Sequence, residues 1–130
     1  MTDNSKSLQQ IENQDWTYPD DKSHLANECK RLWKVPLCEL NTENLRLLIG
    51  QKVSLKYLVP LVLDILEKDP IAEGNLFKGD LLNSVINLPE DFWLKNTTLN
   101  DRVVEIKTDL ETIHQTISTE LLPILKKFDF

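Results

Sequence analysis

Histidine and cysteine are scarce in this sequence, and their spacing gives little support for chemistry. The two histidines, His24 and His114, lie far apart, and neither has a second histidine or a cysteine at a metal-ligand spacing. His24 and Cys29 are five residues apart, which does not place them on one face of a helix. A nucleophilic cysteine needs a base within hydrogen-bond reach, and only folding could bring Cys29 or Cys38 to His114. We therefore predict no catalytic residue, no metal site and no bound cofactor.

Paired carboxylates are the second arrangement that could support chemistry, because two acidic groups can act as acid and base. The pairs Asp20–Asp21 and Glu90–Asp91, together with Asp80, lie where helices are expected to begin. A helix N-terminus carries partial positive charge, so acidic residues there are stabilising without any further role. We expect Asp20 or Asp21, and Asp80, to cap the helices that follow them.

Three other acidic residues, Glu67, Asp69 and Glu73, surround an expected helix end and the loop after it. A helix C-terminus prefers cations, so this placement costs a little stability and favours a role in binding. A solvated surface is the simpler explanation for any one of them alone. As a group they form a candidate partner-binding site.

A second candidate partner-binding site is an aromatic loop near the N-terminus. Trp16 and Tyr18 lie among the carboxylates Asp15, Asp20 and Asp21. Aromatic residues are enriched at the centres of protein interfaces, and charged residues surround them at the rim. Alternatively, Trp16 closes the edge of the core, and the sequence alone does not choose between these two roles.

Helices have to position these groups, because apolar residues recur at helical spacing and no stretch alternates for long enough to indicate a strand. The expected elements are a weak or frayed helix within 1–14, helices over 22–34, 42–49, 54–69, 81–87 and 89–94, and a long helix over 99–127 that Pro123 kinks or ends. The predicted fold class is all-α, a single compact multi-helix domain over 1–130 with a long C-terminal helix.

The helix over 54–69 is expected to be central, since it is apolar on more than one face. Leu61 and Ile65 are predicted to be buried there, and Pro60 to kink the helix or delay its start. In the long helix, an apolar stripe from Leu99 to Leu121 repeats at spacings of three and four residues. This stripe covers the protein's own core or forms the seam of a homodimeric coiled coil.

Composition limits the class of function. The chain has 130 residues, 41% of them hydrophobic, and a formal net charge of −6. An acidic surface repels nucleic acid and anionic lipid, so we expect no nucleic acid and no membrane as partner, whereas a basic protein is favoured.

The N-terminus has no apolar signal core, and no apolar run approaches the ~20 residues of a membrane span. We expect a cytoplasmic protein in which Cys29 and Cys38 are small buried hydrophobic residues.

Short segments between residues 16 and 94 carry a further signal in their order and spacing. The most specific are Leu-Arg-Leu-Leu-Ile-Gly-Gln over 45–51, Pro-Ile-Ala-Glu-Gly over 70–74 and Pro-Glu-Asp-Phe-Trp over 89–93, and others occupy 27–37, 55–61 and 79–82. Taken together, these segments resemble the contact-dependent growth inhibition (CDI) immunity proteins of bacteria. The chain after Leu94 shows no such likeness in detail.

The resemblance implies a helical antitoxin without catalytic residues. Such a protein binds the toxin domain delivered by a neighbouring cell and blocks its active site or the approach of its substrate. The toxin is often a nuclease and often basic, which suits an acidic partner. The expected complex is one cognate toxin domain bound to one monomer. The shared segments are read as the fold, with recognition of the toxin in the polar positions between them.

Two other functions remain open on the sequence alone. A helical scaffold or regulatory subunit would act in a constitutive complex, or as a homodimer through the helix over 99–121. A small hydrolase would use Cys29 or Cys38 as its nucleophile.

Overall fold

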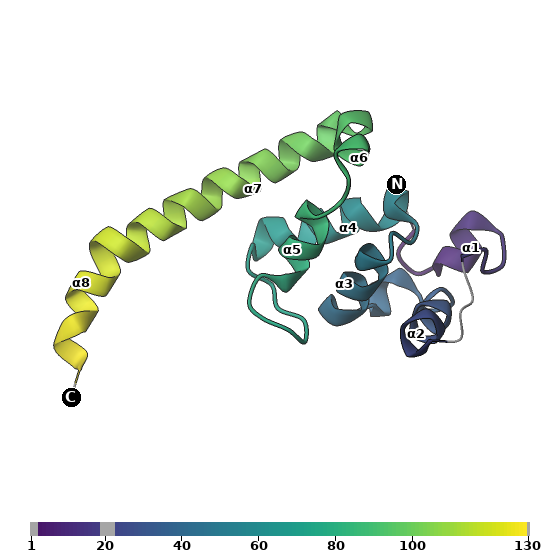
Figure 1. The fold of residues 1–130 in the computed structure, drawn as a ribbon, viewed down its shortest axis with the longest axis horizontal. Helices are drawn as coiled ribbons and strands as arrows, with labels where there is room; N and C mark the ends of the chain where they lie inside the picture. The colour runs from purple at the N-terminus through teal and green to yellow at the C-terminus, as the bar shows by residue number, and fades with distance from the viewer. Residues whose placement is uncertain (1–2, 19–22, 130) are drawn as a thin grey trace. The chain divides into compact units, whose positions relative to one another are not determined.

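The computed structural model describes residues 3–18 and 23–129 of the chain. Figure 1 shows a fold built from helices, and the described residues form no strand beyond two isolated bridges. The predicted all-α fold class is confirmed. The chain divides into two compact units, Met1–Glu90 and Asp91–Phe130, and each is described by itself. The single domain expected from the chain length stays a prediction.

The first unit is arranged around α3. Its elements are α1 (Leu8–Glu12), α2 (His24–Leu32), the 3-10 turn η1 (Leu37–Glu39), α3 (Thr42–Gly50), α4 (Leu55–Lys68) and α5 (Asp80–Ile86). Helix α3 contacts α2, α4 and α5, and α4 also contacts α5. The buried apolar residues of these four helices therefore form one core.

Side-chain caps set where α2 and α3 begin. Asn41 and Asn44 each accept a hydrogen bond from the other's backbone N–H at the start of α3, so the predicted start of this helix is confirmed. Helix α2 is capped by Ser23, whose hydroxyl accepts from a backbone N–H of the first turn. The predicted cap by Asp20 or Asp21 falls on residues outside the described part of the chain.

Helix α4 is the most apolar element of the core. It begins at Leu55 and continues through Pro60, so the proline does not delay its start. Leu61 and Ile65 are only half-buried, and the prediction that they belong to the core is wrong. The inward face consists of Leu58, Val59, Val62, Leu63 and Leu66. Because α4 is apolar on several faces, its sequence is compatible with burial of either the predicted set of residues or the observed set. Packing against α3 and α5 determines which set is buried.

The two cysteines have different environments. Cys29 is buried, which confirms the prediction for this residue, whereas Cys38 is exposed and the prediction for it is wrong. Cys38 lies in η1, where its neighbour Leu37 is the buried residue. In so tight a turn consecutive side chains point in different directions, so apolar neighbours in the sequence do not ensure burial.

The second unit contains one long helical run. After α6 (Glu90–Lys95) come α7 (Thr97–Thr116), the π-helical turn η2 (Ile117–Leu121), α8 (Leu122–Leu125) and the 3-10 turn η3 (Lys126–Phe128), which follow one another without a break in Figure 1. The predicted long C-terminal helix is confirmed, with 32 residues in all. Pro123 does not end it, because the wide turn η2 just before Pro123 accommodates a residue without an N–H group.

The apolar stripe of this helix is covered only in its first half. Ile106 is buried and Leu110 is half-buried, whereas Ile113, Ile117 and Leu121 are exposed. Whether the stripe covers the protein's own core or forms the seam of a homodimeric coiled coil stays a prediction. None of the helices in the described residues has the length and apolar character that a membrane span requires.

Candidate functional site

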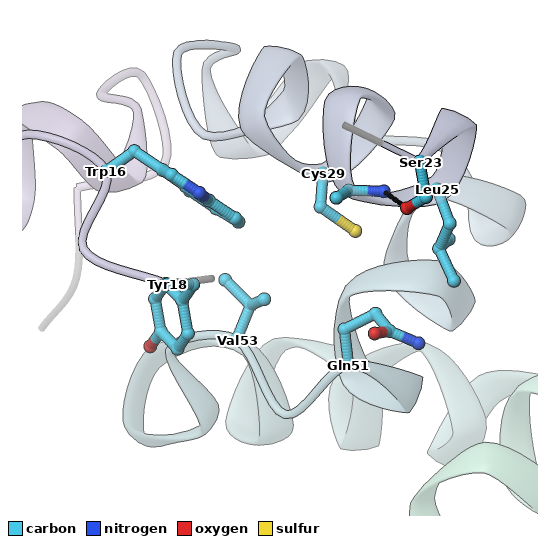
Figure 2. Close-up of a pocket in the computed structure, with 8 residues that line it drawn as sticks. Trp16, Tyr18, Ser23, Leu25, Cys29, Gln51 and Val53 are labelled. Carbon is cyan, nitrogen blue, oxygen red and sulfur yellow. Dashed lines mark hydrogen bonds between the residues drawn. The ribbon is translucent and has the colours of Figure 1, made fainter. Parts of the chain in front are cut away.

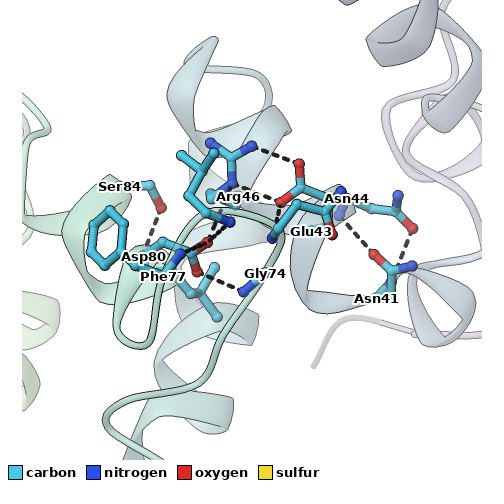
Figure 3. A network of polar contacts seen from close by, with 11 residues as sticks. Asn41, Glu43, Asn44, Arg46, Gly74, Phe77, Asp80 and Ser84 are labelled. Atoms are coloured by element: carbon cyan, nitrogen blue, oxygen red, sulfur yellow. Dashed lines mark hydrogen bonds and ion pairs between the residues drawn. The ribbon is translucent and has the colours of Figure 1, made fainter.

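The loop over 69–79, between α4 and α5, is held by a buried carboxylate (Figure 3). Asp80 is 1% exposed and accepts hydrogen bonds from the backbone N–H groups of Gly74 at 2.6 Å, Leu76 at 2.9 Å and Phe77 at 3.3 Å. The prediction that Asp80 caps its own helix is wrong, because Gly79 occupies the N-cap position of α5. The carboxylate of Asp80 binds the loop instead.

A second carboxylate, on α3, completes the anchor. Glu43 accepts a hydrogen bond from the backbone N–H of Asn75 at 2.9 Å, and it also accepts from Arg46 Nε at 2.8 Å and Nη2 at 2.6 Å. The same guanidinium lies 3.9 Å from Asp80 Oδ2. The four consecutive N–H groups from Gly74 to Phe77 are thus all bonded to two carboxylates, which fixes the loop backbone.

Glycine is required at one point of this anchor. A Cβ atom at Gly74 would lie 2.6 Å from Glu43 Oε1 and 3.2 Å from Asp80 Oδ2. Any side chain would therefore push the loop away from both carboxylates. Gly79 closes the loop with a φ of +94°, a left-handed conformation that suits glycine.

The electrostatics of the anchor keep both carboxylates ionised. Burial raises the pKa of Asp80, but its three backbone N–H donors and Arg46 outweigh burial and leave that pKa below its ordinary value. The hydrogen-bonded guanidinium of Arg46 lowers the pKa of Glu43, and burial opposes this shift only in part. The anchor is therefore a charged, satisfied network rather than a strained one.

The anchored loop presents apolar side chains to solvent. Ile71, Leu76 and Phe77 are 51%, 63% and 49% exposed. Exposed large hydrophobic residues grouped on one loop are typical of an interaction site. None of these three residues was predicted to be a site residue, although Leu76 and Phe77, which are apolar and lie between Gly74 and Gly79 outside any helical period, were a signal for the site.

The three acidic residues predicted to bind a partner lie around this loop. Glu67 is near the end of α4, Asp69 is its C-cap, and Glu73 is within the loop, and all three are exposed. Asp69 Oδ1 accepts a hydrogen bond from the N–H of Ile71 at 3.3 Å, and Glu73 lies 4.0 Å from Lys78. Their role in binding stays a prediction.

The aromatic residues of the other predicted site pack against Trp33 within the first unit. The ring centroids of Trp16 and Tyr18 lie 5.7 Å and 5.9 Å from that of Trp33, which is fully buried. The hydroxyl of Tyr18 accepts a hydrogen bond from the N–H of Ser54 at 3.0 Å. These contacts favour the role at the edge of the core that the sequence left open, and a role in partner binding stays a prediction.

A pocket of about 290 Å³ lies beside this aromatic cluster (Figure 2). It is lined by Trp16, Tyr18, Ser23, Leu25, Ala26, Cys29, Gln51 and Val53. Burial, and then the nearby Glu28, raise the pKa of the Cys29 thiol, so this sulfur stays protonated and is a poor nucleophile. The pocket therefore has a mixed polar and apolar lining and offers no activated nucleophile at Cys29.

The remaining predicted residues near this cluster are acidic. Asp15 is exposed and accepts a hydrogen bond from Gln9 Nε2 at 3.1 Å. Asp20 and Asp21 lie outside the described residues.

Across residues 3–18 and 23–129, no three His, Cys, Asp or Glu side chains are grouped closely enough to hold a metal ion.

A family model of CDI immunity proteins matches residues 10–103. The chain belongs to the CDI immunity protein family. The resemblance inferred from the sequence is therefore confirmed. Comparisons with curated proteins and with solved structures found no match.

As a CDI immunity protein, the chain neutralises a CDI toxin, and its partner is a cognate toxin protein. Members of the CDI immunity family are generally not enzymes. The matched region contains α3, the loop over 69–79 and α5, and it ends at Val103 within α7. The exposed half of the C-terminal helix thus lies beyond the part matched to other CDI immunity proteins.

Proposed function

We propose that this CDI immunity protein neutralises its toxin by docking the anchored loop over 69–79 against it. The observation that carries the proposal is a backbone fixed by Asp80 and Glu43 beneath the exposed side chains of Leu76 and Phe77. A loop already held in one conformation loses little entropy on binding. The apolar side chains of the loop and the acidic residues around it also correspond to the apolar centre and the polar rim of protein interfaces.

The acidic surroundings of the loop suggest the chemistry of the toxin. Glu67, Asp69 and Glu73, within a chain of net charge −6, favour a basic protein surface. A nuclease binds a polyanion, so its substrate site is cationic. An acidic loop over such a site covers the active site or blocks the substrate. The complex forms in the cytoplasm with one toxin domain per chain, and the immunity protein supplies no catalysis.

The first test measures binding of the purified cognate toxin domain to a loop variant. Leu76→Ala combined with Phe77→Ala should weaken binding by about 30-fold, equivalent to about 2 kcal/mol, as expected for anchors at an interface centre. Ile86→Ala, at an apolar residue of α5 that is 52% exposed, is the matched control and should bind as the wild type does. Equal affinity of the loop variant and the wild type, at equal thermal stability, would exclude the loop as the docking site.

The second test addresses charge. Changing Glu67, Asp69 and Glu73 to lysine should slow association and reduce its dependence on salt, because the acidic rim steers a basic partner. The matched control reverses three exposed acidic residues elsewhere, Glu39, Asp101 and Glu105. Both variants have the same net charge, so equal association rates would show that the rim has no local role. Association independent of salt in the wild type would argue against a basic toxin.

A further inference from the structure

The exposed half of the C-terminal helix is an apolar surface that the proposed toxin site does not use. Ile113, Ile117 and Leu121 are 46%, 40% and 49% exposed, and Leu110 before them is half-buried. Ile124, the next apolar residue at this spacing in the sequence, is also exposed. A contiguous apolar face of this kind on a small protein is typical of an interaction site.

The spacing of the stripe is the same in both directions. Residues 110, 113, 117, 121 and 124 follow one another at spacings of three, four, four and three, so Ile117 is the centre. In an antiparallel pair of helices centred there, Leu110 lies opposite Ile124 of the second copy and Ile113 opposite its Leu121. A twofold interface has to be self-complementary in this way. The flanking residues Leu122 and Leu125 are also exposed, so the face stays apolar where η2 widens the turn.

The charges beside the stripe favour the same arrangement. The segment 105–111 has three acidic residues and one lysine, whereas Lys126 and Lys127 lie at the other end of the stripe. In an antiparallel pair centred on Ile117, Lys126 is level with Thr108 of the second copy and within about one turn of its Asp109 and Glu111, whereas Lys127 is level with its Lys107. The facing segments still carry opposite net charge. A parallel pair would instead align lysine with lysine and carboxylate with carboxylate, which is destabilising.

We propose that a second copy of this chain covers the stripe, in an antiparallel helix pair centred on Ile117. The 11-residue step from Ile106 to Ile117 is close to three turns of an ordinary helix, so the two helices stay in contact without marked supercoiling. The stripe from Ile113 onward lies beyond the region matched to CDI immunity proteins, and it shares no residue with the loop proposed to bind the toxin. The working unit is then a dimer in place of the monomer expected from the sequence, with one toxin domain per chain.

The first experiment measures the mass of the full-length protein by light scattering during gel filtration, over a ~100-fold range of concentration. The wild type should reach twice the chain mass of 15.1 kDa. Ile117→Glu, which places two like charges at the twofold axis, should elute at the mass of one chain. Gln115→Glu, which adds the same charge on the opposite face of the helix, should remain a dimer. Circular dichroism of each variant checks that the helix is retained.

A second pair of variants tests the direction of pairing. Lys126→Glu should raise the dimer dissociation constant at least ~10-fold, the factor that corresponds to about 1.4 kcal/mol, because Lys126 is the lysine beside Asp109 and Glu111 of the second copy. Adding Asp109→Lys and Glu111→Lys should restore dimerisation. An unchanged dimer dissociation constant in the Lys126→Glu variant would overturn the antiparallel arrangement.

Two other results would overturn the proposal as a whole. One is a wild type that keeps the mass of a single chain over the full range. The other is a wild type with the mass of a single chain, together with an Ile117→Glu variant that no longer binds the toxin. In that case the toxin, and not a second copy, would cover the stripe. Neither result depends on whether the loop over 69–79 binds the toxin.

Discussion

Asp80→Asn should destabilise the fold far more than its small change in shape suggests. Oδ1 of Asp80 accepts from Gly74, and Oδ2 accepts from Leu76 and Phe77, so both oxygens are occupied. Asparagine keeps one oxygen and places an NH₂ group where the other oxygen faced N–H donors. Hydrogen bonds to a charged group contribute about 1.5–3 kcal/mol each, and one or two are lost. We expect the free energy of unfolding to fall by about 3 kcal/mol.

The same substitution should flatten the acid side of the stability profile. The pKa of Asp80 is below its ordinary value in the folded protein: burial raises it, but the backbone donors and Arg46 outweigh burial. Such a group stabilises the fold above its unfolded pKa, and this contribution is lost as the pH falls through its folded pKa. The wild type should therefore lose stability below about pH 5, and the difference between wild type and Asp80→Asn should shrink there.

The assay is urea unfolding followed by circular dichroism, at about pH 7 and at steps down to about pH 3. Asp101→Asn, at an exposed carboxylate of α7, is the control and should change the free energy of unfolding by less than about 0.5 kcal/mol. A loss below about 1 kcal/mol for Asp80→Asn would refute the role of Asp80 as the anchor of the loop. So would a profile parallel to that of the wild type on acidification.

Three further predictions follow from burial and close contact. Leu66→Ala should reduce the free energy of unfolding by about 2–5 kcal/mol, and Leu61→Ala by clearly less, because only Leu66 is fully buried; urea unfolding at equal slope checks this. Gly74→Ala should cost about 1–3 kcal/mol in the same assay, since the new methyl group meets Glu43 Oε1. Cys38 should react rapidly with a thiol reagent in the folded protein, whereas the buried Cys29 should react only on unfolding, as mass spectrometry would show.

The helices could be predicted largely because their signals are local. The Asn41–Asn44 capping box and the Ser54 start of α4 involve residues a few positions apart, and the long period from Leu99 needs no knowledge of the rest of the fold. What could not be predicted depends on packing. The sequence of α4 is apolar on two overlapping faces, and contacts with α3 and α5 decide that Leu58 and Leu66 face inward rather than Leu61.

Asp80 shows the same limit for the candidate site. Its position before a helical run fits an N-cap, and a carboxylate near a helix start needs no other explanation. Its actual donors belong to the loop three to six residues earlier, and the same loop is also bonded to α3, where Glu43 accepts from the N–H of Asn75. Glu67, Asp69 and Glu73 could be singled out because their charge is unfavourable at a helix C-terminus, which is again a local signal. The exposure of Leu76 and Phe77, in contrast, depends on how the loop is held by Asp80 and Glu43, and this is tertiary structure that no local pattern predicts.

The segments that identified the family also explain how one fold can serve different toxins. Arg46 lies within 45–51, Gly74 ends 70–74, and Asp80 lies within 79–82, so most of the anchor belongs to those segments. The tip of the loop, 75–78, falls between two of them. Because the tip is bonded to the anchor through its backbone N–H groups, its side chains can change without loss of those bonds. Under the proposed function, the anchor therefore maintains a rigid loop, and the side chains of the tip are the part that is matched to the cognate toxin. Recognition then rests on apolar residues such as Leu76 and Phe77 as well as on the polar positions expected from the sequence.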